Sequence, residues 1–203
     1  MIKFTDYAKI ASNYCICYFG QSDEYLVQLK NLKPILEKEF VDLTIYIGCK
    51  DDKTNIFHGQ DHILKLSELK IRKNDFAHIS ELKFNGLTHP VEDFILSSGI
   101  KNYSIPNNSS VKTTKCVIIT SGSHPTKPLE TTKIEKIKRF AITQGMSCEL
   151  NTDVCNSGMV IGVESFGVCQ AASVGIETYL IPTGIGTNLY KNMFPKIKIF
   201  DGT

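Results

Sequence analysis

The chain has 203 residues, of which 42% are hydrophobic and 22% are charged, a balance typical of a globular domain that excludes an intrinsically disordered chain. No apolar run approaches the roughly 18 residues that a membrane-spanning helix needs, so we expect no membrane span. The net charge is only +2, and the basic residues do not form the clustered stripe of a nucleic-acid-binding protein.

The cysteines and the first residues of the chain indicate the compartment. Seven cysteines are present, and no two of them have the Cys-x-x-Cys spacing of zinc or redox sites. Residues 1–11 carry charges throughout and lack the apolar stretch of a secretory signal. We therefore expect a cytoplasmic protein with reduced thiols and no metal site.

The first half of the chain begins with a βαβ pattern. Residues 14–19 are continuously apolar, which favours a strand covered on both faces, as in a parallel sheet. Apolar residues then recur every three or four positions over residues 26–40, the pattern of one helix face, and Pro34 is expected to kink or divide that helix. Residues 43–48 form the next predicted strand.

The pattern is weaker up to a polar segment near the middle of the chain. Short strands are predicted at residues 63–64 and 76–79, and a helix is predicted from Pro90 to Gly99. Residues 101–114 are polar and poor in helix formers, so this segment is predicted to be a linker.

The alternation of strands and helices resumes after this segment. The predicted strands are residues 116–120, 159–163, 178–181 and 196–200. Thr132 and Glu135 have the spacing of a capping box that opens a helix, and a small-residue helix over residues 166–174 ends at Gly175. The sequence thus predicts an α/β protein with two small Rossmann-like parallel-sheet halves, domains 1–112 and 113–203.

Ligands of parallel α/β sheets bind at the carboxyl ends of the strands, so three loops of this chain are candidate ligand-binding sites. In the first loop, Asp23 or Glu24 lies at a helix N-terminus, which stabilises an ionised carboxylate that could act as a general base. The alternative is an ordinary charge at the start of a helix.

The second loop follows the predicted strand at residues 116–120. It contains small hydroxylated residues, free backbone amides and a lysine, as a phosphate site requires, although it is not a P-loop. The candidate residues are Ser121, Gly122, Ser123, Thr126 and Lys127.

The third loop follows the strand at residues 159–163. Glu164, Ser165 and Gly167 could bind sugar hydroxyls or amide donors, whereas the alternative is that Ser165 only caps the next helix.

The order of these pieces resembles the family 9 glycosyltransferases, the ADP-heptose:lipopolysaccharide heptosyltransferase group. The segment Phe19-Gly20-Gln21-Ser22-Asp23-Glu24 is similar to their Leu-Gly-x-x-Gly-Asp motif, with Glu24 in the place of the acid. Residues 126–129 (Thr-Lys-Pro-Leu) resemble a Thr-Lys-x-Trp segment without the tryptophan. Residues 164–172 resemble an Asp-Thr-Gly-x-x-His-x-Ala-Ala signature, with Cys169 where the histidine stands.

The resemblance implies a shortened GT-B architecture, in which two Rossmann-like domains face a cleft. It implies a metal-independent inverting glycosyltransferase that needs no cofactor and transfers a sugar from a nucleotide-sugar donor to a glycan, a lipid-linked acceptor or a lipopolysaccharide-type acceptor. Glu24 would be the catalytic base, Lys127 and the amides of residues 121–123 would balance the charge of the leaving diphosphate, and Glu164 and Ser165 would orient the donor. The alternative is a degenerate, non-catalytic module that binds nucleotide sugars or has a regulatory role.

Overall fold

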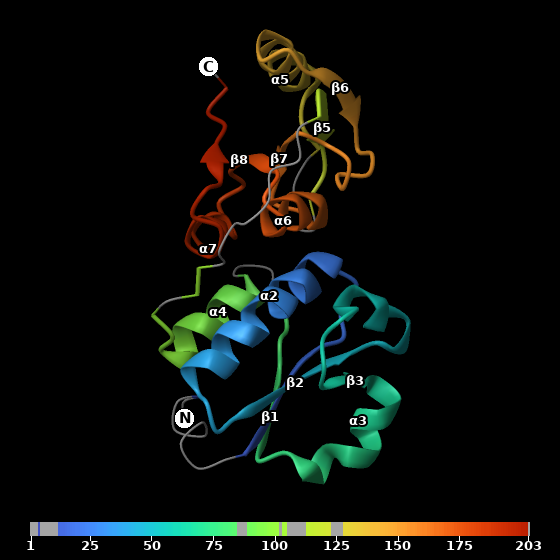
Figure 1. The fold of residues 1–203 in the computed structure, drawn as a ribbon, viewed down its shortest axis with the longest axis vertical. Helices are drawn as coiled ribbons and strands as arrows, with labels where there is room; N and C mark the ends of the chain where they lie inside the picture. Colours follow the sequence, from blue (N-terminus) through green and yellow to red (C-terminus); the bar gives the residue numbers. More distant parts are fainter. Residues whose placement is uncertain are drawn as a thin grey trace. The chain divides into compact units, whose positions relative to one another are not determined.

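The structure, a computed structural model, describes residue 4 and residues 12–84, 89–101, 103–104, 113–122 and 128–202. The chain divides into two compact units, Met1–Tyr103 (unit 1) and Ser104–Thr203 (unit 2), each with its own sheet (Figure 1). The boundary lies within the polar segment predicted as a linker, and earlier than the expected division after residue 112.

Unit 1 contains a four-stranded, fully parallel sheet with the order β3-β2-β1-β4. Its strands are β1 (Asn13–Tyr18), β2 (Thr44–Cys49), β3 (Ile63–Lys65) and β4 (His78–Glu81). The helices are α2 (Asp23–Glu39), α3 (Leu66–Arg72) and α4 (Pro90–Ser98), with the 3₁₀ helices η1 (Asp51–Phe57) and η2 (Lys73–Asp75). Helices α2 and α4 lie side by side over one face of the sheet, and α3 lies by the other (Figure 1).

The residues of β1 explain why its sequence is continuously apolar. Cys15 and Cys17 face α3, where they pack with Leu69, and Ile16 between them is fully buried as well. A strand buried on both faces has no position at which a polar side chain would meet water, so the alternation typical of a half-exposed strand is missing.

Helix α2 runs unbroken from Asp23 to Glu39, so of the two expected effects of Pro34, a kink or a division, the division is wrong. A proline within a helix removes the N–H that would bond to the carbonyl four residues earlier, here the carbonyl of Lys30. The side chain of Gln60 donates to that carbonyl from Nε2 at 2.7 Å. A side chain from outside the helix therefore replaces the missing backbone hydrogen bond.

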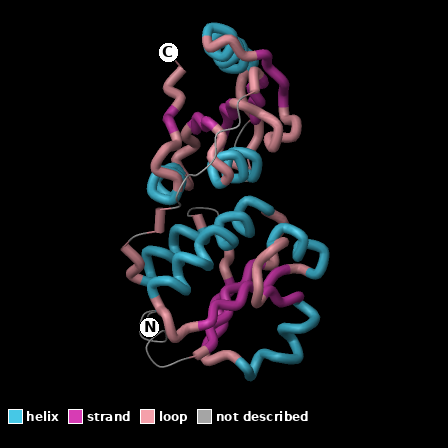
Figure 2. The backbone as a smooth tube through the Cα atoms, viewed as in Figure 1, coloured by secondary structure: helices cyan, strands magenta, loops and turns pink. Residues whose placement is uncertain are grey.

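Unit 2 contains a five-stranded, fully parallel sheet with the order β6-β5-β7-β8-β9. Its strands are β5 (Lys115–Ile119), β6 (Ser147–Leu150), β7 (Met159–Val163), β8 (Glu177–Ile181) and β9 (Lys198–Ile199). The helices are α5 (Thr131–Thr143), α6 (Phe166–Ser173) and α7 (Thr187–Met193) (Figure 2). One face of the sheet packs on Ile137 and Ala141 of α5, and the buried side chains of α6 contact β7 and β8.

Two features of unit 2 differ from the prediction. Helix α5 begins at Thr131 after Glu130, and no side chain caps its first turn, so the predicted capping box of Thr132 and Glu135 is wrong. Strand β6 was not predicted at all, because most of its side chains are exposed and it shows no apolar run.

The molecule is an α/β protein with two parallel sheets covered by helices, as the sequence predicts. Among the helices of the described residues, none combines the length and the apolar composition needed to cross a membrane.

Candidate functional site

Each sheet has one point at which its strand order reverses. In unit 1 the chain builds β1, β2 and β3 in one direction and then places β4 on the other side of β1. In unit 2 it builds β5 and β6 and then places β7 on the other side of β5. The loops after the two strands at a reversal diverge to opposite faces, and the crevice between them is the usual ligand site of such sheets.

In unit 2 this crevice is an open pocket of about 400 Å³, which we call the reversal pocket. Its walls are the end of β5, the loop after β6 and the first turns of α6. The lining residues are Ile119, Ser121, Asn151, Thr152, Asp153, Val154, Phe166, Gly167 and Gln170. The volume lies within the range of roughly 300–1,000 Å³ of small-molecule sites.

Hydrogen bonds to β5 fix the loop after β6. Asn151 adopts a left-handed conformation (φ 50°), which asparagine tolerates better than most residues. Its Oδ1 accepts from the backbone N–H of Thr120 at 2.9 Å, and its Nδ2 donates to Thr120 Oγ1 at 2.8 Å. The loop is thus tied to the strand that forms the opposite wall of the pocket.

Asp153 supplies a negative charge to the reversal pocket. The backbone N–H of Cys155 donates to Asp153 Oδ1 at 3.0 Å, and this hydrogen bond lowers the pKa of the exposed carboxyl below its ordinary value. Asp153 is therefore ionised at neutral pH and can accept hydrogen bonds from ligand hydroxyl groups.

The N-terminal turn of α6 forms another wall of the pocket. Gly167 lies in this turn, and a Cβ added there would be 3.3 Å from Ile119 Cδ1 and 3.5 Å from Val154 Cγ1. A glycine at this position thus keeps the floor of the pocket free. The N-terminus of a helix carries unpaired N–H groups and a partial positive charge, which together favour an anion.

Glu164 does not line the reversal pocket. Its side chain is fully buried, and its carboxylate accepts hydrogen bonds from the loop between β8 and α7. The donors are Thr183 N, Thr183 Oγ1, Gly186 N at 3.0 Å and Thr187 Oγ1. Glu164 therefore holds that loop in place.

Ser165 has the structural role that the sequence left open. It is the N-cap of α6, and its Oγ accepts from the backbone N–H of Val168 at 3.4 Å. Its own N–H donates to Tyr190 Oη, and that hydroxyl donates to the Ser165 carbonyl, both at 3.0 Å. The capping alternative is confirmed, and Tyr190 links this turn to α7.

The predicted donor-binding residues thus separate into three groups. Ser121 and Gly167 line the pocket, and Gly122 adjoins Ser121 in the chain. Glu164 and Ser165 make contacts within the protein. Ser123, Thr126 and Lys127 lie outside the described residues.

In the described part of unit 1, buried polar side chains lie beside the corresponding reversal. Glu24, in the first turn of α2, is fully buried; its Oε1 accepts from Gln28 Nε2 at 3.3 Å and lies 3.5 Å from Nε2 of His89, which precedes α4. The ring of Tyr25 packs edge-on against the His89 imidazole, with 4.7 Å between centroids. Asp23, next to Glu24, is half-buried and pairs with Lys53 at 2.6 Å. Glu24, the predicted catalytic base, is therefore part of a buried polar cluster, which we call the Glu24 cluster (Glu24, Gln28 and His89).

Comparisons with protein-family models, with curated proteins and with solved structures found no match to this chain. The resemblance to family 9 glycosyltransferases therefore stays a prediction that rests on the motifs alone. Sequence reasoning missed Asn151, Asp153 and Gln170 of the pocket. The first two follow β6, and only recognition of that exposed strand would have pointed to them.

Proposed function

We propose that unit 2 binds a nucleotide-sugar donor in the reversal pocket, and that the chain is a glycosyltransferase-like protein of the GT-B type. The observation that carries this proposal is an open pocket at the strand-order reversal, lined by both polar and apolar side chains, with a carboxylate on one wall and a helix N-terminus on another. A nucleotide sugar combines hydroxyl groups with a diphosphate, so it matches both walls.

Each wall has a role in this proposal. The N-terminal turn of α6 at Gly167 faces the diphosphate, as helix N-termini do in nucleotide-binding sheets. Asp153, after the second strand of the unit, accepts hydrogen bonds from ribose hydroxyl groups, since an acidic residue at that place serves this purpose in dinucleotide-binding folds. Phe166 and Val154 form the apolar part of the lining, and Ser121 and Gln170 offer polar groups to the remaining hydroxyls.

The test is a thermal-shift and calorimetric screen against ADP-, GDP-, UDP- and CMP-linked sugars. We expect one nucleotide class to raise the melting temperature, because a ligand that binds only the folded state stabilises it. Gly167→Leu would fill the floor of the pocket and should abolish the shift, whereas Thr132→Leu on the exposed face of α5 should leave it unchanged. No shift with any donor, or the same shift in both variants, would refute the proposal.

The burial of Glu24 favours a second candidate, a non-catalytic nucleotide-sugar-binding module. A general base must reach the proton that it removes, and Glu24 is enclosed by its own unit-1 neighbours Gln28 and His89. If the chain is a transferase with Glu24 as its base, Glu24→Gln lowers turnover by about a hundredfold or more at unchanged donor affinity. If it is a binding module, the wild-type chain binds the donor but neither transfers nor hydrolyses the sugar. Asp23→Asn is the matched control, because Asp23 pairs with Lys53 in a partly exposed ion pair.

A further inference from the structure

Strand β4 forms one edge of the unit 1 sheet. Strand β4 pairs with β1 on one side, and no strand of the described residues pairs with its other side. The N–H of Leu82, directly after β4, donates to the Cys17 carbonyl at 2.7 Å. Because N–H direction alternates along an extended chain, the backbone groups of Glu81 and Lys83 point away from β1, toward the open edge.

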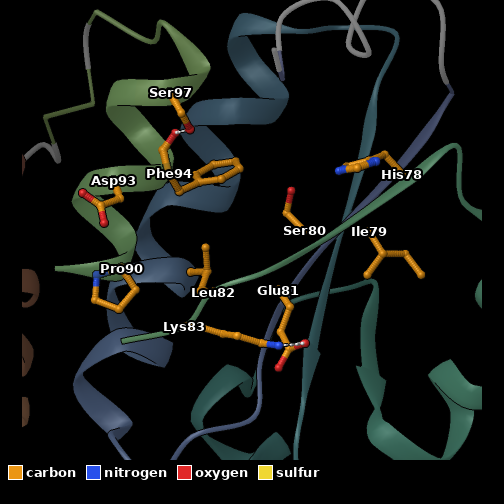
Figure 3. A pocket seen from close by; sticks show the side chains of 10 residues that line it. All are labelled: His78, Ile79, Ser80, Glu81, Leu82, Lys83, Pro90, Asp93, Phe94 and Ser97. Carbon is orange, nitrogen blue, oxygen red and sulfur yellow. Dashed lines mark hydrogen bonds and ion pairs between the residues drawn. The ribbon is translucent and has the colours of Figure 1, made fainter. Parts of the chain in front are cut away.

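A pocket of about 500 Å³ lies along this edge (Figure 3). Residues 78–83 all line it, together with Pro90, Asp93, Phe94 and Ser97 of α4. Ser80 faces the α4 side, where its Oγ is 2.5 Å from Tyr14 Oη, and Ile79 packs with the cluster on the α3 side. Ser80 and Ile79 are consecutive residues whose side chains face opposite sides of the sheet. Both can line the same pocket only if that pocket runs along the outer edge of the strand. The pocket therefore lies where a further strand of the sheet would pair with β4.

The charged residues on this edge can pair with the same residues of a second copy of the chain. Glu81 and Lys83 form an exposed ion pair at 3.1 Å, which also shows that both side chains lie on the same face (Figure 3). In an antiparallel pairing centred on Leu82, Glu81 of one copy lies opposite Lys83 of the other, and the reverse pair follows by symmetry. Both residues present their backbone groups to the open edge, as a hydrogen-bonded antiparallel pair requires.

The other face of this pairing is apolar. Leu82, which is buried in its own copy, lies opposite Leu82 of the second, and half-buried Phe84 lies opposite Ser80, which lines the same pocket as Phe94 of α4. Cross-strand apolar contacts and opposite-charge pairs both stabilise an antiparallel ladder. Residues 80–84 thus match a second copy of themselves on both faces, over a length usual for a strand.

We propose that a second copy of this chain binds along β4, so that residues 80–84 of the two copies pair antiparallel and join the unit 1 sheets into one. A charged edge is also a common defence against pairing. A charge prevents edge pairing when it has no opposite charge in the facing strand. In the antiparallel register centred on Leu82, Glu81 and Lys83 each lie opposite a residue of opposite charge.

The experiment is a charge-swap series on the full chain by sedimentation equilibrium, from nanomolar to near-millimolar protein. Glu81→Lys places four positive charges at the centre of the pairing and Lys83→Glu places four negative ones. We expect each to weaken the dimer by about thirtyfold, since two attractive pairs become two repulsive ones. The double variant E81K/K83E restores the opposite-charge pairs and the dimer, and an equimolar mixture of the two single variants forms a mixed dimer.

Matched controls are Glu135→Lys and Lys138→Glu, which change the net charge equally at an exposed ion pair of α5 (2.8 Å) in unit 2. They should leave self-association unchanged. Slower hydrogen exchange at the amides of Glu81 and Lys83 in the dimer would place the contact on this edge. A monomer at every concentration, or single variants that associate as the wild type does, would overturn the proposal.

Discussion

The two units place a buried carboxylate at the carboxyl edge of a parallel sheet and use it differently. Glu24 of unit 1 contacts Gln28 of its own helix and His89 before α4, so it spans the helices that start at either side of the β1/β4 reversal. Glu164 of unit 2 turns away from the β5/β7 reversal and binds the loop after β8, the next strand in the sheet.

The two acids therefore lie differently with respect to the strand-order reversal of their sheets. In the described residues of unit 1, Glu24 lies between the helices that start on either side of the reversal, whereas Glu164 of unit 2 contacts the loop one strand further along, beside a pocket of about 400 Å³. Topology therefore gives the position of a possible ligand site, but the direction of one or two side chains decides whether the position is filled. The comparison predicts that both acids stabilise their units, and that only unit 2 responds to a ligand.

The largest expected effect is at Glu164. Glu164→Ala leaves the donors of the β8–α7 loop without their buried acceptor, and we expect the free energy of unfolding of unit 2 to fall by about 4 kcal/mol. The measurement is urea unfolding followed by circular dichroism and by amide exchange in β8. The control is Glu177→Ala on β8, where an exposed ion pair with Lys198 (2.6 Å) contributes about 1 kcal/mol or less. Equal, small losses in both variants would mean that Glu164 does not hold the loop.

The second effect concerns the Glu24 cluster of unit 1. Glu24→Ala removes a fully buried carboxylate from Gln28 and His89, and we expect unit 1 to lose about 3 kcal/mol of unfolding free energy. Asp23→Ala, one residue earlier, breaks only a partly exposed ion pair with Lys53 and should cost about 1 kcal/mol or less. If the two variants were equally stable, the Glu24 cluster would not stabilise unit 1, and a catalytic role for Glu24 would gain weight.

The sequence predicts the fold better than the site, and the reason is burial. The apolar strands at the centre of each sheet were predicted within a residue or two, since a strand covered on both faces has a continuous apolar signature. The exposed edge strand β6 was missed because Cys148 and its neighbours show no such run. Asn151 and Asp153 follow that strand, so one wall of the pocket was missed with it.

The roles of Glu24 and Glu164 could not be read from local sequence. Both positions follow a buried strand, and both were predicted to face a ligand. Their partners are far away in the chain: His89 for Glu24, and Thr183 to Thr187 for Glu164. Only the tertiary structure brings these partners close, and the motif that contains each acid does not include them.

The third effect concerns the charge of Asp153 in the reversal pocket of unit 2. Asp153→Asn keeps the size of the side chain and removes its charge, so we expect donor affinity to fall about tenfold, the loss of one hydrogen bond to a charged group. Because the pKa of Asp153 is lowered, the binding form persists from neutral pH to about pH 4, and affinity should decline only below that. Calorimetry over this range is the measurement. Glu177→Gln on β8, whose carboxylate pairs with Lys198 at 2.6 Å, is the control and should bind normally.

The smallest expected effect is on the reactivity of Cys155. It is the one exposed cysteine of the seven, whereas Cys148 is half-buried and the other five are buried. Gln170 Nε2, on the wall of the reversal pocket, lies 3.4 Å from Cys155 Sγ, so a bound donor should cover the thiol. Partial burial raises the pKa of Cys155, and alkylation should therefore be measured at pH 9, where a larger share of the thiol is ionised.

We expect one fast thiol, which Cys155→Ser removes, and a several-fold slower reaction at saturating donor. The buried Cys15 and Cys17 of unit 1 should react only on unfolding, with or without donor, because both are fully buried in the apolar cluster beside α3. If saturating donor left the rate at Cys155 unchanged, the donor would not occupy the Gln170 end of the pocket. If it instead changed the rate at Cys15 or Cys17, the ligand-responsive crevice would belong to unit 1, and the comparison between the two units would be reversed.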